Sequence, residues 1–491
     1  MMPTFDPFGS IGQHAELTGQ NIPGVANVSE AELRKAILAG LPVHTPGSGN
    51  LDAIMPEDLS ALVTELTFQD KHNVVGKLLA KAEASNMLHQ FARLQNQGGL
   101  DADFVTEGGG TEVDADPEYD RPNVQLRQVT RSYRLTEAMR RVRVLSGSGA
   151  NAAKAELQRQ ALIKAERNLD FARVLGRNAA NPRSYNGIIP LLEAAETTAG
   201  LTDTYIIDMR GEELTPEKLD EQVVAIFNRA GSPENLLTSA DIIGRLAQRQ
   251  LASRRDTLPI AAKPGPVHQG MMVNGFLSST GYSVEYTPTV VMQPEYHTLG
   301  FNAAGVGPNR PDQPVIASIG AGAPGGGQVS KWVAADNGNY TYRVAAYGIR
   351  GQSVSADSGA QAVTAGQMVS ITITDAAVNL VDHYKVWRRR GTGPFQFMAQ
   401  VPKAAFGTDT VIEDLNHDVP GTSWALMFNP APDNVQKVLL GNKDFEEFPI
   451  AFGTDANFPT SWGYLLIKFE AIALRAPQWM VAFKNCASRN V

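Results

Sequence analysis

Cysteine is almost absent from this sequence of 491 residues, which contains Cys486 alone. A single cysteine excludes a disulfide within the chain, so stability must come from packing and assembly, and folding in a reducing cytoplasm is expected. We expect Cys486 to act as a small buried hydrophobe rather than as a reactive thiol.

Long apolar runs are missing as well. No segment approaches the roughly 18 residues that a membrane-spanning helix requires. The opening residues, MMPTFDPFGSIGQHAELTG, lack the basic and then apolar pattern of a secretory signal. We therefore expect neither a membrane contact nor export.

Motifs that carry chemistry are absent too. None of the eight histidines is spaced as HxH or HxxxH, which disfavours a metal site, and no GxSxG nucleophile motif occurs. The stretch GAGAPGGGQVSK lacks the GK[ST] ending of a phosphate-binding loop, so a flexible linker is the better interpretation. The sequence predicts no enzyme, no cofactor and no metal.

The composition is that of an ordinary globular protein, with 43% hydrophobic and 19% charged residues. The length suggests two to four domains. The formal net charge of -8 argues against a surface that coats nucleic acid or membrane, although a local basic patch remains open.

Residues 1–85 are predicted to form an N-terminal arm with helices. Ser29 and Glu32 make a capping-box pattern ahead of AELRKAILAG, and the pattern from Met55 to Glu83 is mostly helical. An extended arm and an ordinary helical subdomain are both compatible with this segment.

Residues 86–136 are predicted to form an extended loop. NMLHQFARLQ (86–95) and VQLRQVTRSYRLT (124–136) have strand patterns, and the connection between them is far longer than a hairpin loop. Such long connections are usually functional or disordered.

The charges of this loop are segregated. Eight acidic residues occupy the connection, namely Asp101, Asp103, Glu107, Glu112, Asp114, Asp116, Glu118 and Asp120. Six arginines follow, namely Arg127, Arg131, Arg134, Arg140, Arg141 and Arg143. A solvated acidic loop and a Ca²⁺ site are alternatives, but the run lacks the glycine and terminal glutamate of an EF-hand loop. A third hypothesis is intersubunit contact, in which the acidic residues meet the arginines of another copy.

Residues 137–311 combine helices and strands. A long helix is predicted over 147–177, with an apolar stripe at helical spacing. Two helices are predicted within 215–250, capped by Thr215 and Ser239, with Pro216 at the first helical position. Residues 271–299 are predicted to form strands.

Residues 312–425 differ from their surroundings, because helical patterning vanishes. In NYTYRVAAYGIRGQSVS (339–355), Tyr340, Tyr342, Val344 and Ala346 alternate with other residues, as in a half-buried strand. VSITITD, HYKVWRRR, FQFMAQV and TVIEDL follow as short alternating strands, and the segment is about the size of one β-sandwich, ~100 residues. Residues 426–491 return to a mixed strand pattern, so the sandwich is predicted to be inserted into a host domain.

This order of elements resembles the major capsid protein of tailed double-stranded DNA phages, the HK97-type fold. Segment 86–136 resembles its E-loop and 150–178 its spine helix. SYNGIIPLL is similar to the segment entering the peripheral domain, and GSPENLLTSADIIGRLAQ to the helical part of the axial domain. The resemblance implies an α+β capsid fold in which 312–425 is an inserted Ig-like domain on the outer face.

The same resemblance implies a structural function. The chain would assemble into hexamers and pentamers of an icosahedral virion capsid, built in the host cytoplasm around double-stranded DNA that its inner face contacts non-specifically. Scaffolding, portal and cement proteins would be partners. Residues 96–123 contain no lysine, which excludes the lysine–asparagine cross-link that some members form from this loop.

Two rivals remain. An encapsulin-type nanocompartment shell would use the same fold to enclose cargo enzymes. A sandwich-bearing carbohydrate-binding protein or hydrolase would need a cleft with paired carboxylates and usually an export signal, and the sequence shows neither.

Overall fold

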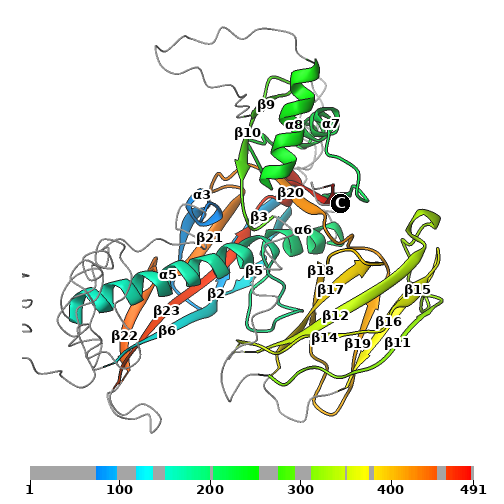
Figure 1. Ribbon diagram of the computed structural model, residues 1–491. Helices are drawn as coiled ribbons and strands as arrows, with labels where there is room; N and C mark the ends of the chain where they lie inside the picture. The colour runs from blue at the N-terminus through cyan, green and yellow to red at the C-terminus, as the bar shows by residue number, and fades with distance from the viewer. Residues whose placement is uncertain are drawn as a thin grey trace, which may run out of the picture.

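The computed structural model describes residues 73–96, 118–136, 150–198, 203–253, 275–292, 311–348, 351–374, 381–450 and 461–487. The capping-box helix after Ser29 and most of the acidic connection lie outside these ranges. Figure 1 shows three parts: a long helix along a sheet, a second sheet with two helices beside it, and a separate β-sandwich.

The first part pairs one long helix with one sheet. Helix α5 (Ala150–Leu175) has 26 residues, about 39 Å at 1.5 Å per residue, and confirms the predicted rod. The sheet has the order β1-β21-β23-β22, and β6 also pairs with β23. Its strands are β1 (Ala80–Ala84), β6 (Arg127–Thr136), β21 (Val435–Leu440), β22 (Glu446–Ile450) and β23 (Ser461–Leu474).

Alternation along β23 decides which side of this sheet meets the helix. Leu466 packs with Ala161 of α5 and Tyr133 of β6, whereas Ala471 and Ala473 pack on the opposite side. The apolar stripe predicted for the helix is confirmed, since Ala161, Ala165 and Leu169 are buried.

The predicted helix from Met55 to Glu83 is wrong at its C-terminal end. Only α3 (Val75–Leu78) is helical in the described part of that range, and Ala80–Ala84 form β1, parallel to β21. Alanine, lysine and glutamate favour a helix. However, these residues alternate in burial, and pairing with β21 outweighs their local preference.

The second sheet has the order β7-β24-β20-β8-β10-β9. Its strands are β7 (Ile206–Asp208), β8 (Asn235–Thr238), β9 (Gly275–Leu277), β10 (Ser283–Pro288), β20 (Ser423–Phe428) and β24 (Val481–Cys486). Helices α7 (Pro216–Asn228) and α8 (Ala240–Ser253) pack on it through Leu219, Val223 and Leu246. Cys486 is buried there, and burial raises the pKa of its thiol to about 12.

The predicted helix caps have different outcomes. The Thr215 side chain accepts a hydrogen bond from the Lys218 backbone N–H at 3.3 Å, which confirms the first cap. Ser239 directly precedes α8, but its hydroxyl makes no hydrogen bond within the described residues. Helix α6 (Ile188–Glu196) links α5 to the second sheet and packs on both through Ile188 and Leu192.

The sandwich consists of two sheets. One has three strands in the order β11-β16-β19. The other has six: β13, β14 and β15 pair with β12, β12 also pairs with β17, and β17 pairs with β18. The larger strands are β11 (Ile316–Gly322), β12 (Gly338–Gly348), β16 (Met368–Ile373), β17 (His383–Arg390), β18 (Gln396–Pro402) and β19 (Thr410–Asp414). The smaller ones are β13 (Gly351–Gln352), β14 (Ala356–Asp357) and β15 (Gln361–Val363), and a 3-10 turn, η4 (Ala334–Asp336), precedes β12. Tyr340, Tyr342, Val344 and Ala346 all enter the core between the sheets, as their alternation predicts.

Two predicted details of this segment need correction. Ser423–Ala425 belong to β20 of the second sheet, so the strands of the sandwich end at Asp414 and the chain has returned to the core by Ser423. Gly320–Gly322 are not linker but the end of β11, hydrogen-bonded to β16. Glycine lowers the propensity for a strand without preventing pairing where a neighbouring strand offers the ladder.

Candidate assembly surfaces

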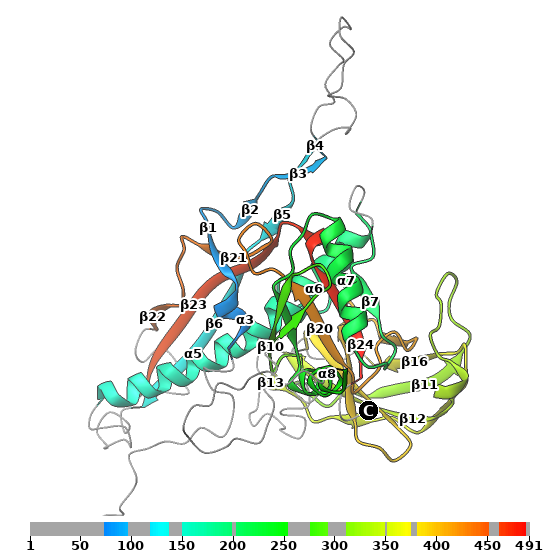
Figure 2. The ribbon, with the colours of Figure 1, turned by 90° about the horizontal axis from the view of Figure 1, so that it is seen from above.

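A two-stranded ribbon projects from the body, as Figure 2 shows. It consists of β2 (Leu88–Gln90) paired with β5 (Asn123–Gln125), and β3 (Arg93–Asn96) paired with β4 (Glu118–Asp120). Leu94 and Tyr119 lie opposite each other and are 43% and 67% exposed, and Leu88 is 50% exposed. Two strands without a covered face are marginally stable in water, so this ribbon needs a partner surface.

The base of the ribbon already has such a surface on its own chain. Phe91 and Leu126 pack on Ala84, Val438 and Ala471, on the side of the first sheet that faces away from α5. This contact fixes where the ribbon leaves the body.

An apolar row continues along the same sheet side, beginning with Phe469 at the edge of the ribbon contact. Phe448 of β22 lies opposite Leu465, and Leu465, Ile467 and Phe469 share one side of β23. Phe448 is 46% exposed and the other three are partly buried. We call these four residues the apolar strip. Polar residues of β6 flank it, because Gln128, Thr130 and Ser132 lie opposite Phe469, Ile467 and Leu465.

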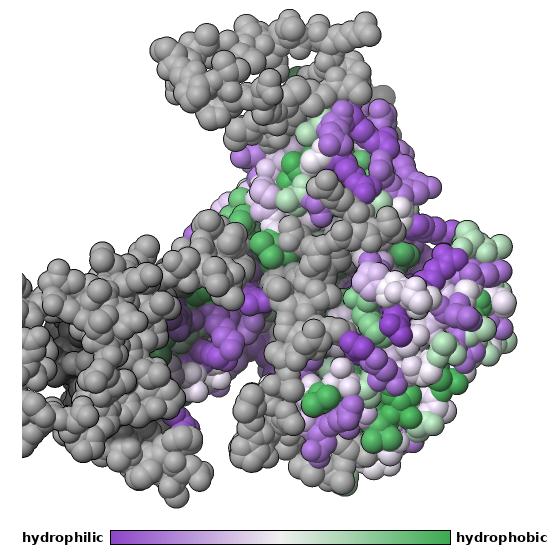
Figure 3. Space-filling view, viewed as in Figure 1, coloured by the Kyte–Doolittle hydropathy of each residue, from purple (hydrophilic) through white to green (hydrophobic). Residues whose placement is uncertain are grey.

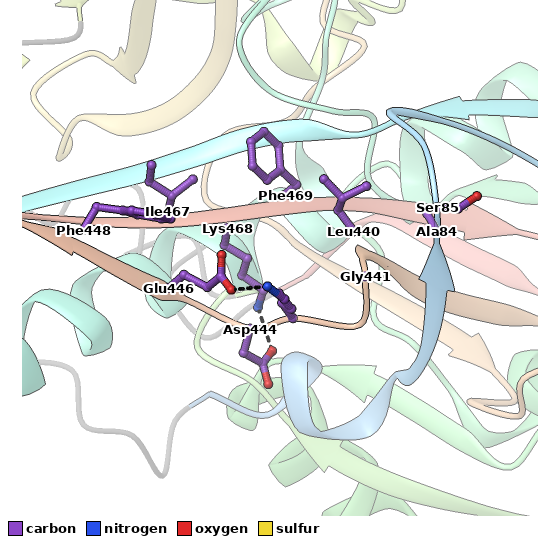
Figure 4. A pocket seen from close by; sticks show the side chains of 11 residues that line it. Ala84, Ser85, Leu440, Gly441, Asp444, Glu446, Phe448, Ile467, Lys468 and Phe469 are labelled. Atoms are coloured by element: carbon purple, nitrogen blue, oxygen red, sulfur yellow. Dashed lines mark ion pairs between the residues drawn. The ribbon is translucent and has the colours of Figure 1, made fainter.

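A pocket of about 420 Å³ lies along the strip, and Phe448, Ile467 and Phe469 are among its lining residues. It lies where β21 ends at Leu440 and β22 begins at Glu446, and Ile467 and Phe469 line its apolar side (Figure 4). Lys81 and Lys468 are paired with Asp444 at 2.6 and 3.5 Å, and Lys443 with Glu446 at 2.6 Å. Burial opposes ionisation of Asp444, but the two lysines outweigh it and lower its pKa.

The structure describes five of the fourteen predicted contact residues. Glu118 and Asp120 lie in β4, and Asp120 is paired with Arg93 of its own chain. Arg127, Arg131 and Arg134 lie in β6. The other nine lie outside the described residues, namely Asp101, Asp103, Glu107, Glu112, Asp114, Asp116, Arg140, Arg141 and Arg143.

The three described arginines do not form a single basic surface. Arg127 and Arg131 share the side of β6 that carries Tyr133, which faces α5. Burial lowers the pKa of Arg131. Arg134 is on the opposite side, with the apolar strip, because successive residues of a strand point to opposite faces.

A buried charge network joins α5 to β23 and was not predicted. Arg173 contacts both carboxylate oxygens of Glu470 at 2.7 and 3.0 Å, and Asp170 at 2.6 Å. Lys468 contacts Glu470 at 2.9 Å and Glu166 at 3.2 Å, and Tyr185 donates to Glu470 at 3.1 Å. The sequence signal was present in KFEAIAL, where Lys468 and Glu470 alternate in phase with apolar residues that face the core.

The network has two carboxyl groups with opposite shifts. Burial opposes ionisation of Glu470, but Arg173 and Lys468 outweigh it and hold its pKa at about 2. Burial raises the pKa of Asp170 to about 6, against the attraction of Arg173. Asp170 also accepts a hydrogen bond from the Gly76 backbone N–H at 2.9 Å, which ties α3 to α5.

Within the described ranges, no group of three or more histidine, cysteine, aspartate or glutamate side chains is placed to hold a metal ion. None of the helices described here is both long and apolar enough to cross a membrane. On the face seen in Figure 3, hydrophobic residues form small separate groups among polar ones.

The chain matches no family model and no curated protein. It is similar to solved shell structures. The capsid of an empty GTA particle has a TM-score of 0.46 and 8% identity, covering 91% of this chain and 100% of that one. The capsid of cyanophage P-SCSP1u has a TM-score of 0.42 and 9% identity, covering 94% and 99%. The holo-SrpI encapsulin complex from Synechococcus elongatus has a TM-score of 0.37 and 9% identity, covering 94% and 96%.

Proposed function

We propose that this chain is the self-assembling structural subunit of an icosahedral phage capsid, forming hexamers and pentamers around double-stranded DNA. The observation that carries the proposal is the pairing of two incomplete surfaces in one molecule. The outer ribbon exposes Leu94 and Tyr119 without a core, and the first sheet carries a partly exposed apolar strip.

The two surfaces have the same character. The base of the ribbon packs on one part of a sheet side, and the apolar strip continues along that side. A ribbon that packs on this kind of surface within its own chain can pack on it in a neighbouring copy. A head-to-tail contact of this type closes into rings when the rotation between copies permits it.

The acidic connection of the ribbon would strengthen that contact. We expect its acidic residues from Asp101 to Asp116 to meet basic residues of a neighbouring copy. Of the described arginines, Arg134 shares the side of the strip and is the one placed to receive them. Each exposed ion pair contributes only ~0–1 kcal/mol, but assembly repeats the contact in every copy.

The sandwich is proposed to be an Ig-like domain on the outer face of the shell, inserted between the second sheet's β10 and β20. Support comes from its two-sheet core, which is separate from the cores of the two other sheets (Figure 1). Contact with DNA on the inner face, and with scaffolding, portal and cement proteins, completes the proposal.

Electron microscopy and sedimentation velocity of the recombinant chain test this function. Closed shells or rings are expected for the wild type, and Leu94→Ser with Tyr119→Ser should leave unassembled, folded subunit. Val329→Ser is the matched control, because Val329 is 73% exposed but lies in the sandwich. A monodisperse monomer at all concentrations would refute the proposal, and shells that purify with a cargo enzyme instead of DNA would favour an encapsulin.

A further inference from the structure

Asp208, at the end of β7, connects the second sheet to the sandwich. One carboxylate oxygen accepts hydrogen bonds from the Asn485 side chain at 2.8 Å and from the Arg210 backbone N–H at 3.1 Å. The other oxygen is paired with Lys331, which belongs to the loop before β12. Burial opposes ionisation of Asp208, but the bonds from Lys331 and Asn485 outweigh it and lower its pKa.

Asn485 fixes the returning connection at the same place. Its side chain donates to the His417 carbonyl at 2.9 Å and accepts from the Val419 backbone N–H at 3.0 Å. Asn485 is 3% exposed and has a φ of 56°, a conformation that asparagine tolerates better than most residues. Lys484 is also paired with Asp418 at 2.6 Å. Asp208 and Asn485 thus hold the loop before β12 and the connection that leaves the sandwich after β19.

A second attachment lies at the far end of β12. Arg183, between α5 and α6, is paired with Asp382 at 2.7 Å. This attachment lies beside Tyr347, because the Asp382 backbone N–H donates to the Tyr347 carbonyl. The attachment at Lys331 lies beside Tyr340, because the neighbouring Trp332 packs against the Tyr340 ring. Tyr340 and Tyr347 are seven positions apart on one strand, which separates the two attachments by about 20 Å.

Between these attachments the sandwich and the core are not continuously packed. A cleft of about 400 Å³ remains, lined by Phe171 and Leu175 of α5, Met398 and Gln400 of β18, and Trp424. Apolar packing across this boundary is therefore incomplete, and the polar contacts at the two attachments add to it.

We propose that the pairs Lys331–Asp208 and Arg183–Asp382 form a two-point latch that holds the sandwich in one orientation relative to the core. One attachment leaves a rotation free, whereas two attachments about 20 Å apart do not. The sandwich is then a rigid extension of the subunit rather than a tethered module. This inference concerns the single subunit and does not depend on assembly into a shell.

Distance measurement between two spin labels tests the latch. Labels are attached to Glu221→Cys on α7 and Ala365→Cys in the sandwich, both at exposed positions, in subunits diluted with unlabelled protein. Cys486 is fully buried and should not react. The wild type is expected to give one narrow distance, Lys331→Met and Arg183→Gln a broader one, and the double variant a loss of the single distance.

Asp357→Asn is the matched control, because it removes an ion pair with Arg343 that lies wholly within the sandwich. It should leave the distance unchanged, and circular dichroism should show all variants folded. A broad distribution in the wild type, or a double variant with the wild-type distance, would overturn the proposal. If the double variant does not fold, the two single variants decide in the same way.

Discussion

Replacing Arg173 with methionine is the sharpest test of the buried charge network. Arg173 is 1% exposed and contacts three carboxylates, those of Glu470, Asp170 and Glu166. Methionine fills similar space but leaves Glu470 buried without its guanidinium partner, beside Lys468 and Tyr185. Breaking a buried pair by removing one partner costs about 3–5 kcal/mol, because an uncompensated charge stays in the interior.

Urea unfolding of the unassembled subunit, followed by circular dichroism, measures this loss as a lower midpoint with an unchanged slope. Arg159→Met is the matched control on the same helix, since Arg159 is 51% exposed and its contact with Glu156 is 3.5 Å long. It should cost only ~0–1 kcal/mol.

Adding Glu470→Gln to Arg173→Met is expected to restore part of the loss, because the second change removes the carboxylate that the first left without its guanidinium. The reasoning is refuted if Arg173→Met costs no more than Arg159→Met. It also fails if the double variant is less stable than the sum of the two single losses predicts.

Changes of pH, of the acidic loop and of protease access provide the other tests. The pKa of Asp170 is about 6 in the folded state and about 3.9 in the unfolded state. The protonated carboxyl therefore stabilises the fold below pH 4 by up to about 3 kcal/mol, and this stabilisation is lost as the pH rises to 6. A pH series of urea midpoints should show the loss in the wild type and not in Asp170→Asn. The pKa of Glu470 is lowered to about 2, so its carboxylate stabilises the fold above about pH 4.3, and this stabilisation is lost as the pH falls to 2. Changing Asp114, Asp116, Glu118 and Asp120 to asparagine or glutamine should impair assembly while the monomer stays folded. High salt should weaken assembly of the wild type in the same direction. If sedimentation shows that the variant assembles normally at low salt, the loop is only a solvated surface feature. Limited proteolysis of particles should cut at the turn Gly325–Gln328 before α5, and the reverse order would place the sandwich inside the shell.

Local pattern was sufficient where one face of an element is apolar. Tyr340, Tyr342, Val344 and Ala346 were correctly predicted to line one side of a strand, because a period of two leaves no other arrangement that buries all four. The stripe of α5 was predictable for the same reason, with a period of 3.6. Strands were also predicted over 86–95 and 124–136, although Phe91 and Ala92 separate β2 from β3. Strand β4 (Glu118–Asp120) was not predicted, because it lies in the stretch assigned to the acidic connection.

Pairing between distant segments was not predictable from the sequence. Ala80–Ala84 become a strand only because β21, more than 350 residues later, offers a parallel partner. The boundary of the sandwich failed similarly: Ser423–Ala425 continue an alternating pattern, and only their pairing with β8 and β24 places them in the second sheet.

Buried charges were the hardest feature to predict, as Arg388 and Glu470 show. Arg388, Arg389 and Arg390 are consecutive in HYKVWRRR, yet of the three only Arg388 is buried. Its partners Asp414 and Asn416, at 2.6 and 2.7 Å, come from β19 and the turn after it. Similarly, Glu470 is 297 residues from Arg173.

A charge at a core position therefore becomes interpretable only when its partner is known, because alone it would cost several kcal/mol. In this protein such pairs lie where separate segments must meet in one register: α5 on β23, and β17 on β19. A misplaced register would leave each charge buried without its partner. We infer that these pairs contribute specificity of the fold more than net stability, since apolar residues in both positions would pack as well but would tolerate a shift.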